Sequence, residues 1–185
     1  LAERQFPVGR LTLLASPRSA GQSVEWNGQT LTIEPVSAEA FNGVDVVLAS
    51  AGGSVSKQWA PVAAAAGAVV IDNSSAFRMD AEVPLVVPEV NPHAAFAHNG
   101  VIANPNCTTI VSLMAATPLH RLFGLTRLTA CSYQAVSGAG LPAMLELEEQ
   151  ARQWVAGQPM QTKVFRRPTL FNVFPHDSAL LDDGS

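Results

Sequence analysis

The sequence predicts an α/β fold in which a parallel sheet is covered by helices. One observation is the segment 44–71, where an apolar strand run, a glycine turn, a helical stretch and a second strand run follow one another. This order defines a βαβ unit, whose two strands are parallel. The other observation is a third strand run at Val101–Ala103, which leads through a tight turn into a helical pattern beginning at Cys107.

The segments before the βαβ unit predict three strands. Residues 11–15 (LTLLA) form a short apolar run before a Pro/Ser/Gly cluster, which is typical of a buried strand that ends in a loop. Residues 23–36 alternate between polar and apolar side chains around Asn27 and Gly28. An Asn-Gly pair between two such runs predicts a β-hairpin.

Within the βαβ unit, residues 44–49 and 68–71 are the predicted strands and residues 55–66 the predicted helix. Ser54 is expected to cap the helix, because its side-chain oxygen can accept a hydrogen bond from the first turn. Pro61 is unfavourable in the helix interior because it has no backbone N–H to donate.

The rest of the chain mixes helical and extended patterns. The helix that starts at Cys107 is followed by residues 125–136, which alternate like a strand. Residues 141–156 form a further predicted helix, which Gly157 ends. Three glutamates are expected near its start, where they favour the helix dipole. The tail is expected to be loop with a short strand at residues 171–174.

Composition narrows the class of protein. The chain has 185 residues, of which 48% are hydrophobic and 14% charged, with a formal net charge of −4. This mild acidity gives no reason to expect nucleic acid or an anionic membrane as a partner, and no apolar run approaches the ~18 residues that span a bilayer.

Two cysteines do not make a disulfide framework, which favours a reducing cytoplasm. H-E-x-x-H and C-x-x-C patterns are absent, so no metal site is predicted.

Cys107 is the strongest candidate for chemistry. It stands in the segment IANPNCTTI, directly after Asn106, which is a good helix N-cap residue. A thiol in the first helical turn faces unpaired backbone N–H groups and the positive end of the helix dipole, and both favour the thiolate. The alternative is a cysteine that packs as a small hydrophobe, and position alone does not separate the two. Cys131, in LTACSYQ, is expected to pack in the core.

Three other loops carry residues that suit anionic ligands. Ser16, Arg18 and Ser19 follow the first strand, and an Arg among hydroxyls suits the 2′-phosphate of NADP. The turn SAGGS (50–54) opens a helix and lets the backbone approach a dinucleotide. Arg78, in SSAFRMD, can meet an anion. Each of these loops, taken alone, is also consistent with an ordinary solvated loop.

Taken together, these segments resemble aspartate-semialdehyde dehydrogenase. SAGGSVSKQWAP, AGAVVIDNSSAFRMD, VPLVVPEVNP, IANPNCTTI, YQAVSGAG and FNVFPH are similar to segments of that family and occur in its order. The resemblance implies a Rossmann-like NADP-binding domain in residues 1–106, without the family's first strand and glycine turn. It implies the first part of an α+β catalytic and dimerisation domain in residues 107–185. Both domains are thus expected to be incomplete in this chain, and the protein is expected to be a homodimer.

The resemblance also implies roles for individual residues. Cys107 matches the nucleophile, and Gln134 matches the glutamine that orients the acyl intermediate. Arg78 and Asn106 match residues that bind phosphate or the substrate anion. The residues that match cofactor-binding loops are Ser16, Arg18, Ser19, Gly52, Gly53, Ser137 and Gly138.

The implied reaction is the NADP-dependent interconversion of aspartyl 4-phosphate and aspartate 4-semialdehyde through a cysteine thioester. Thr108, Val111 and the segment NVFPHDS depart from the family's usual Cys-Ser-Thr-Ile-Gln and NVIPHID. Two alternatives therefore stay open. One is another acyl-phosphate reductase, such as N-acetyl-glutamyl-phosphate reductase. The other is a non-catalytic paralogue that keeps the fold as a binding or regulatory protein.

Overall fold

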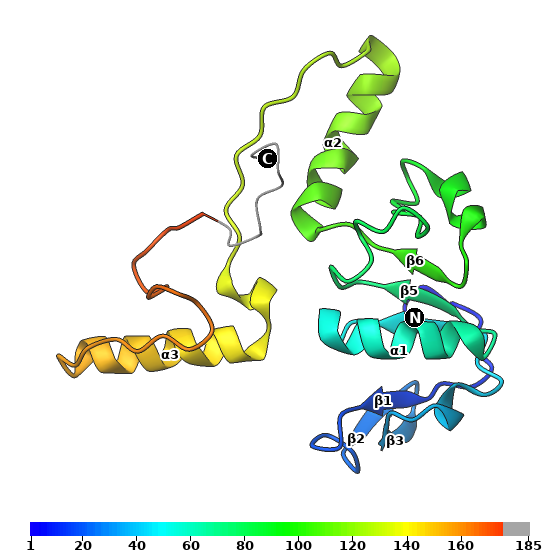
Figure 1. Ribbon diagram of the computed structural model, residues 1–185, viewed down its shortest axis with the longest axis horizontal. Coiled ribbons are helices and arrows are strands. Elements are labelled where there is room, and N and C mark those ends of the chain that lie inside the picture. The colour runs from blue at the N-terminus through cyan, green and yellow to red at the C-terminus, as the bar shows by residue number, and fades with distance from the viewer. Residues whose placement is uncertain (176–185) are drawn as a thin grey trace. The chain divides into compact units, whose positions relative to one another are not determined.

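A computed structural model describes residues 1–175, and its elements are labelled in Figure 1. The chain divides into two compact units, of which the first is Leu1–Leu128 and the second begins at Thr129. The first unit contains two three-stranded sheets, ordered β1-β3-β2 and β4-β5-β6. The predicted α/β class is confirmed.

The first sheet contains the predicted hairpin. Its strands are β1 (Leu13–Ala15), β2 (Ser23–Trp26) and β3 (Gln29–Pro35). β1 runs parallel to β3, and β2 runs antiparallel to it. Asn27 and Gly28 connect β2 to β3 with φ angles of 52° and 77°. A two-residue hairpin turn requires such positive φ values at both positions, which Asn and Gly tolerate best.

The second sheet is fully parallel and contains the predicted βαβ unit. Its strands are β4 (Val46–Ala49), β5 (Val69–Asp72) and β6 (Val101–Ala103), and α1 (Gly53–Ala65) connects β4 to β5. The predicted cap at Ser54 is wrong, because the helix already begins at Gly53 and Gly52 is its N-cap. Gly52 has a φ of 97°, a value that side-chain-bearing residues rarely adopt.

The core of the first unit lies between α1 and one face of this sheet. Alternate strand residues point to opposite faces, so Val70, which is fully buried, faces the helix while its neighbour Ile71 does not. Ala60 and Ala63 of α1 are buried against the sheet, where their small side chains allow close packing. Pro61 lies on the exposed side of the helix, where water can replace the hydrogen bond it cannot make.

The helix α2 (Cys107–Phe123) follows β6 and ends at Gly124, whose φ is 70°. Within the first unit, the last turn of α2 is held to the loop before β6 by Arg121, which donates hydrogen bonds to the carbonyl oxygens of Glu89 (3.0 Å) and Val90 (3.2 Å). The strand predicted at residues 125–136 is wrong. Residues 125–135 form neither helix nor strand, Val136 begins a 3₁₀-helix, and no strand in the described part of the chain pairs with this segment to supply the hydrogen bonds that a sheet requires.

The second unit contains η3 (Val136–Ala139), a short 3₁₀-helix, and α3 (Leu141–Val155). Gly157 lies two residues after α3 with a φ of 66°, as expected for a helix end. The strand predicted at residues 171–174 is wrong, because Phe171 has a φ of 55° and the N–H of Asn172 turns back to the carbonyl of Thr169. His176, which completes FNVFPH, and the end of NVFPHDS lie outside the described residues.

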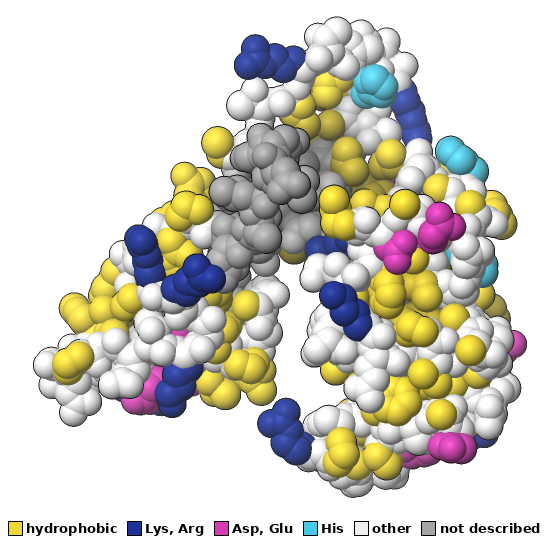
Figure 2. Space-filling view, in the orientation of Figure 1, with side chains coloured by type: hydrophobic (Ala, Val, Ile, Leu, Met, Phe, Trp, Pro, Cys, Tyr) yellow, Lys and Arg dark blue, Asp and Glu magenta, His cyan; other side chains and the backbone are white. Residues whose placement is uncertain are grey.

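Hydrophobic side chains are spread over the visible surfaces of both units, and charged side chains are sparse among them (Figure 2). This agrees with the low charged fraction of the sequence. Within residues 1–175, no helix combines the length and the apolar character needed to cross a membrane. In the same residues, no group of three or more His, Cys, Asp or Glu side chains could hold a metal ion.

Candidate active site

Cys107 is the first residue of α2, and its side chain is exposed. The strand β6 leads to it through buried Pro105 and through Asn106. The side-chain oxygen of Asn106 accepts a hydrogen bond from the backbone N–H of Thr108 at 2.9 Å, so the predicted N-cap is confirmed. The thiol therefore stands at a helix start and is accessible to a ligand.

Cys131 is also exposed, so the prediction that it packs in the core is wrong. An alternating segment buries one face when it is part of a packed sheet, and residues 125–135 belong to no sheet in the described structure. Burial therefore does not distinguish the two cysteines. Their local backbone does.

We expect brief treatment with iodoacetamide at neutral pH to alkylate Cys107 faster than Cys131 in the full-length protein. Both thiols are exposed, but only Cys107 lies in the first turn of a helix, a position in which reactive cysteines of enzymes are often found. Peptide mapping by mass spectrometry over a time course gives the two rates. Equal rates, or faster modification of Cys131, would contradict an activating role for the helix start.

Arg78 lies at the same edge of the second sheet as the turn that leads to Cys107. Its Nε donates a hydrogen bond to the carbonyl oxygen of Asn104 at 2.9 Å, and one Nη donates to that of Asn73 at 3.1 Å. These carbonyls directly follow β6 and β5. The side chains of the two asparagines are joined as well, because Asn104 Nδ2 donates to Asn73 Oδ1 at 2.7 Å. Arg78 thus links the ends of two neighbouring strands.

The guanidinium of Arg78 can still bind an anion. Both of its acceptors are uncharged carbonyls, and in the described part of the chain it makes no ion pair. A guanidinium has five N–H donors, and these two hydrogen bonds use only two of them. The remaining donors suit a phosphate or carboxylate.

The glycine turn lies beside the loop that carries Arg78. A Cβ atom at Gly53 would lie 3.8 Å from Ser75 Oγ and 4.0 Å from the backbone nitrogen of Ala76. The structure therefore brings Gly53, Arg78 and the Asn106–Cys107 turn to the carboxyl ends of β4, β5 and β6. In parallel α/β sheets, ligands bind outside this edge.

Three further residues at this edge, Asp72, Asn73 and Asn104, were not predicted from the sequence. Asp72 is fully buried and accepts hydrogen bonds from Ser56 and Ser74. The sequence did carry a signal for Asp72, since it is an acidic residue at the end of an apolar strand run and is followed by the polar residues Asn-Ser-Ser. Asn73 and Asn104 gave no signal, because their contact depends on the register of β5 and β6.

The remaining predicted residues lie elsewhere. Ser16, Arg18 and Ser19 follow β1 of the first sheet, in a turn where the carbonyl of Ser16 accepts the N–H of Ser19 at 2.9 Å. Ser16 and Arg18 are exposed. Among the described residues, this turn shares no hydrogen bond with the group around Arg78 and Cys107.

Gln134, Ser137 and Gly138 belong to the second unit. The structure brings Gln134 and Gly138 together, since a Cβ at Gly138 would lie 1.8 Å from Gln134 Nε2 and 2.9 Å from its Cδ. Glycine at this position therefore leaves the space that the Gln134 amide occupies. Both residues, with Ser137, are exposed.

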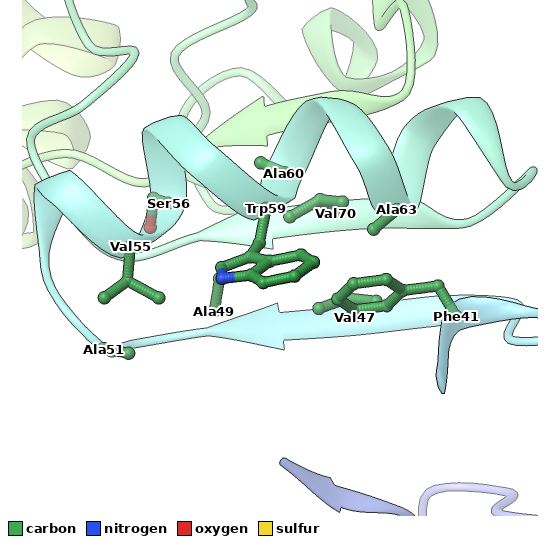
Figure 3. A pocket seen from close by; sticks show the side chains of 10 residues that line it. All are labelled: Phe41, Val47, Ala49, Ala51, Val55, Ser56, Trp59, Ala60, Ala63 and Val70. Atoms are coloured by element: carbon green, nitrogen blue, oxygen red, sulfur yellow. The ribbon is translucent and has the colours of Figure 1, made fainter. Parts of the chain in front are cut away.

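An apolar pocket lies between α1 and β4 (Figure 3). The side chain of Trp59 points from α1 toward β4 there, with Phe41 beside it at a ring-centroid distance of 6.1 Å. The ten lining residues carry no charge, and Ser56 contributes a hydroxyl group. The pocket therefore does not suit an anionic substrate, and the candidate site is the sheet edge.

Comparison with known proteins identifies the family. Residues 1–98 match the family model described as semialdehyde dehydrogenase, NAD binding domain, and residues 117–185 match semialdehyde dehydrogenase, dimerisation domain. The aspartate-semialdehyde dehydrogenase of Synechocystis sp. is 54% identical over 180 residues, which are 97% of this chain and 53% of that protein. The chain belongs to the aspartate-semialdehyde dehydrogenase family. The resemblance inferred from its segments is confirmed.

Other members of the family agree. The aspartate-semialdehyde dehydrogenase of Aquifex aeolicus is 47% identical over 188 residues, which cover 100% of this chain and 55% of that protein. The crystal structure of aspartate semialdehyde dehydrogenase II from Vibrio cholerae superposes with a TM-score of 0.87 at 45% identity, covering 98% of this chain and 55% of that one. The same enzyme complexed with ASA gives a TM-score of 0.88. The chain spans about half the length of the curated relatives it matches. The family membership and the fold confirm a Rossmann-like domain for a nicotinamide cofactor.

Proposed function

We propose that the protein carrying this chain interconverts aspartate 4-semialdehyde and aspartyl 4-phosphate, with NADP as cofactor. The observation that carries the proposal is the exposed Cys107 at the start of α2, with the Arg78 guanidinium held at the same sheet edge. The choice of substrate is supported by the relatives, which are named aspartate-semialdehyde dehydrogenase, and by the Vibrio cholerae structure complexed with ASA.

In the oxidative direction, the Cys107 thiolate attacks the aldehyde carbon and forms a thiohemiacetal. A bound nicotinamide cofactor would supply the hydride acceptor for the oxidation of that carbon. The hydroxyl proton goes to a base, and a thioester remains on Cys107. Phosphate then attacks the thioester carbon, the acyl phosphate leaves, and the thiolate is regenerated. The carbonyl oxygen becomes negative during both attacks, and we assign its stabilisation to backbone N–H groups beside Cys107. In the biosynthetic direction the same steps run in reverse.

The anionic groups of the substrates are assigned to residues near Cys107. Arg78, whose remaining donors face no carboxylate partner in the described residues, and Asn106 bind the phosphate or the substrate anion. Gln134 orients the acyl intermediate. We assign these three roles because the residues occupy matching positions in the family segments IANPNCTTI, SSAFRMD and YQAVSGAG.

The residues at the sheet edge fit a dinucleotide. Gly52, with its positive φ, makes a tight turn into α1. The first N–H groups of α1 belong to Gly53 and Ser54, whose small side chains leave room for a pyrophosphate to approach them. Exposed Arg18, between Ser16 and Ser19, suits the 2′-phosphate of NADP. Ser137 and Gly138 are assigned to a second loop along the cofactor.

We further propose a homodimer that acts in the cytoplasm. The dimer is supported by the match of residues 117–185 to a dimerisation domain. We also propose that residues 1–106 belong to the NADP-binding domain and residues 107–185 to the catalytic and dimerisation domain, so that Cys107 stands at their junction. The two family matches, which end at residue 98 and begin at residue 117, support this division.

The full-length protein, given aspartate semialdehyde, phosphate and NADP⁺, is expected to form NADPH in repeated turnovers, followed by absorbance. Omission of phosphate should limit product to about one NADPH per site, because the thioester is not released. N-acetyl-glutamate semialdehyde in place of aspartate semialdehyde tests the related reductase activity, and NAD⁺ in place of NADP⁺ tests the cofactor. A folded protein that binds NADPH but turns over neither aldehyde would support the non-catalytic alternative and refute the proposal.

A further inference from the structure

Asp72 is a fully buried carboxylic acid that the proposed mechanism does not use. Its Oδ1 accepts hydrogen bonds from the Ser56 hydroxyl at 2.7 Å and from the backbone N–H of Ser74 at 3.0 Å. Its Oδ2 accepts a hydrogen bond from the Ser74 hydroxyl at 2.8 Å. Burying a carboxyl group is costly unless donors of this kind satisfy it. The donors come from two different segments, so Asp72 joins them.

The first segment is the start of α1. Ser56 lies in its first turn, and its backbone N–H donates to the carbonyl of Gly52 at 3.0 Å. The Ser56 side chain is buried, and its hydroxyl points from the helix toward β5. The bond from Ser56 to Asp72 therefore fixes the glycine turn to the end of β5.

The second segment is the loop that carries Arg78. Ser74 Oγ donates to Asp72 and also accepts the N–H of Ala76 at 3.1 Å, which fixes the turn that precedes Arg78. That turn places the guanidinium within reach of the carbonyls of Asn73 and Asn104. The hydrogen bonds of Ser74 therefore restrain the loop that carries Arg78.

We propose that Asp72 is a positioning residue that holds the cofactor-binding glycine turn, through Ser56, and the phosphate-binding Arg78, through Ser74, in fixed places at the sheet edge. This inference rests on the proposed function, because that function gives the two segments different ligands. Asp72 touches neither substrate nor cofactor in this role. If Asp72 has this role, loss of its hydrogen bond to Ser56 should weaken cofactor binding, and loss of its hydrogen bonds to Ser74 should weaken phosphate binding.

The test compares Ser74→Ala with Ser56→Ala in the full-length protein. Loss of one buried hydrogen bond is worth about a tenfold change in an equilibrium constant. Ser74→Ala should therefore raise the KM for phosphate about tenfold and leave the KM for NADP⁺ within about twofold. Ser56→Ala should give the opposite pattern. Asp72→Asn, which keeps the size of the side chain but replaces one acceptor oxygen by a donor, should raise both KM values.

Ser37→Ala is the matched control. Ser37 Oγ accepts the N–H of Ala40 at 3.3 Å, in a partly buried turn between β3 and β4. Among the described residues, Asp72 shares its side-chain hydrogen bonds with Ser56 and Ser74 and not with this turn. Like Ser74→Ala, this variant removes a hydroxyl oxygen that accepts a backbone N–H in the same turn, from Ala40 for Ser37 and from Ala76 for Ser74. It should lower Tm to a similar extent as Ser74→Ala but change neither KM. A purely structural role for Asp72 predicts that Ser56→Ala and Ser74→Ala both behave like this control.

The inference is overturned if Ser74→Ala and Ser56→Ala change the two KM values in the same proportion, or change neither. If the wild-type protein forms no NADPH, the proposed function fails, and the positioning role is then read from binding. Calorimetric titrations with inorganic phosphate and with NADPH should show the same split between the two variants. If each variant lost affinity for phosphate and for NADPH equally, or lost affinity for neither, the positioning role would be refuted independently of the proposed function.

Discussion

Cys107→Ser is expected to lower kcat/KM for aspartate semialdehyde by at least about a thousandfold, because a serine hydroxyl is scarcely ionised at neutral pH and cannot replace the thiolate as nucleophile. The substitution changes one exposed atom at a helix start. We therefore expect the free energy of unfolding to change by no more than about 0.5 kcal/mol. Steady-state NADPH formation and urea unfolding, measured on the same preparations, separate the two effects.

The covalent intermediate gives a second, more direct measurement. Wild-type protein mixed with aspartate semialdehyde and NADP⁺ without phosphate should carry an acyl group on the peptide that contains Cys107, detected by mass spectrometry. Cys107→Ser should carry none. Cys131→Ser is the control, since it removes the other exposed thiol and should retain both the adduct and the turnover. An adduct on Cys131, or wild-type turnover by Cys107→Ser, would show that the nucleophile has been assigned wrongly.

The parts of this site that the sequence predicts are those built from neighbouring residues. Asn106 caps α2 two residues before the N–H that it accepts, and Asn27-Gly28 forms a hairpin turn through its own φ angles. Both are decided by the preferences of one or two side chains. The βαβ unit is likewise visible, because its glycine turn and its apolar runs are contiguous in the sequence.

The parts that it does not predict depend on contacts between distant residues. Asn73 and Asn104 are 31 positions apart and meet only because β5 and β6 pair in a particular register. The segment 125–136 shows the opposite error. Its alternation indicates a strand, but alternation reports only which side chains share a face and says nothing of whether another strand is there to pair with.

The glutamates of helix α3 also lie where the sequence did not predict them. The three glutamates were expected near its start, but the helix begins at Leu141 and its first turn contains no acidic residue. Glu146 is the sixth helical residue and is only 9% exposed. Its role is tertiary. Together with Gln150 and Gln153, at helical spacing on the same face, it accepts backbone N–H groups from the segment that follows the helix.

The contacts of Glu146 leave little room for an amide in its place. Oε2 accepts the N–H of Lys163 at 2.6 Å and that of Val164 at 2.5 Å, while Oε1 faces the Nε2 of Gln150 at 3.3 Å. Every neighbouring group is a donor. In Glu146→Gln, the new NH₂ group would face one set of these donors in either orientation, and at least one hydrogen bond would be lost.

We expect Glu146→Gln to lower the free energy of unfolding by about 1–3 kcal/mol, which is the usual cost when a buried N–H group loses its charged hydrogen-bond acceptor. Hydrogen exchange should localise the effect, because the amides of Lys163 and Val164 should lose protection. Glu148→Gln, on the same helix, is the control. Its exposed pair with Arg152 at 3.4 Å is worth little, so its effect should stay within about 0.5 kcal/mol.

The same contacts make the stability of this segment depend on pH. Burial raises the pKa of Glu146, but the N–H groups of Val164, Lys163 and Phe165, helped by the charge of Lys163, together hold that pKa below its ordinary value of 4.5. A carboxyl group with a lowered pKa stabilises the folded state above about pH 4.5, and this contribution is lost as the pH falls through the folded-state pKa. Urea unfolding of the wild type and of Glu146→Gln should therefore differ most at neutral pH and converge below pH 4.5. A difference that does not fall as the pH is lowered through the acid range in which Glu146 becomes protonated would mean that the carboxylate charge does not anchor this segment.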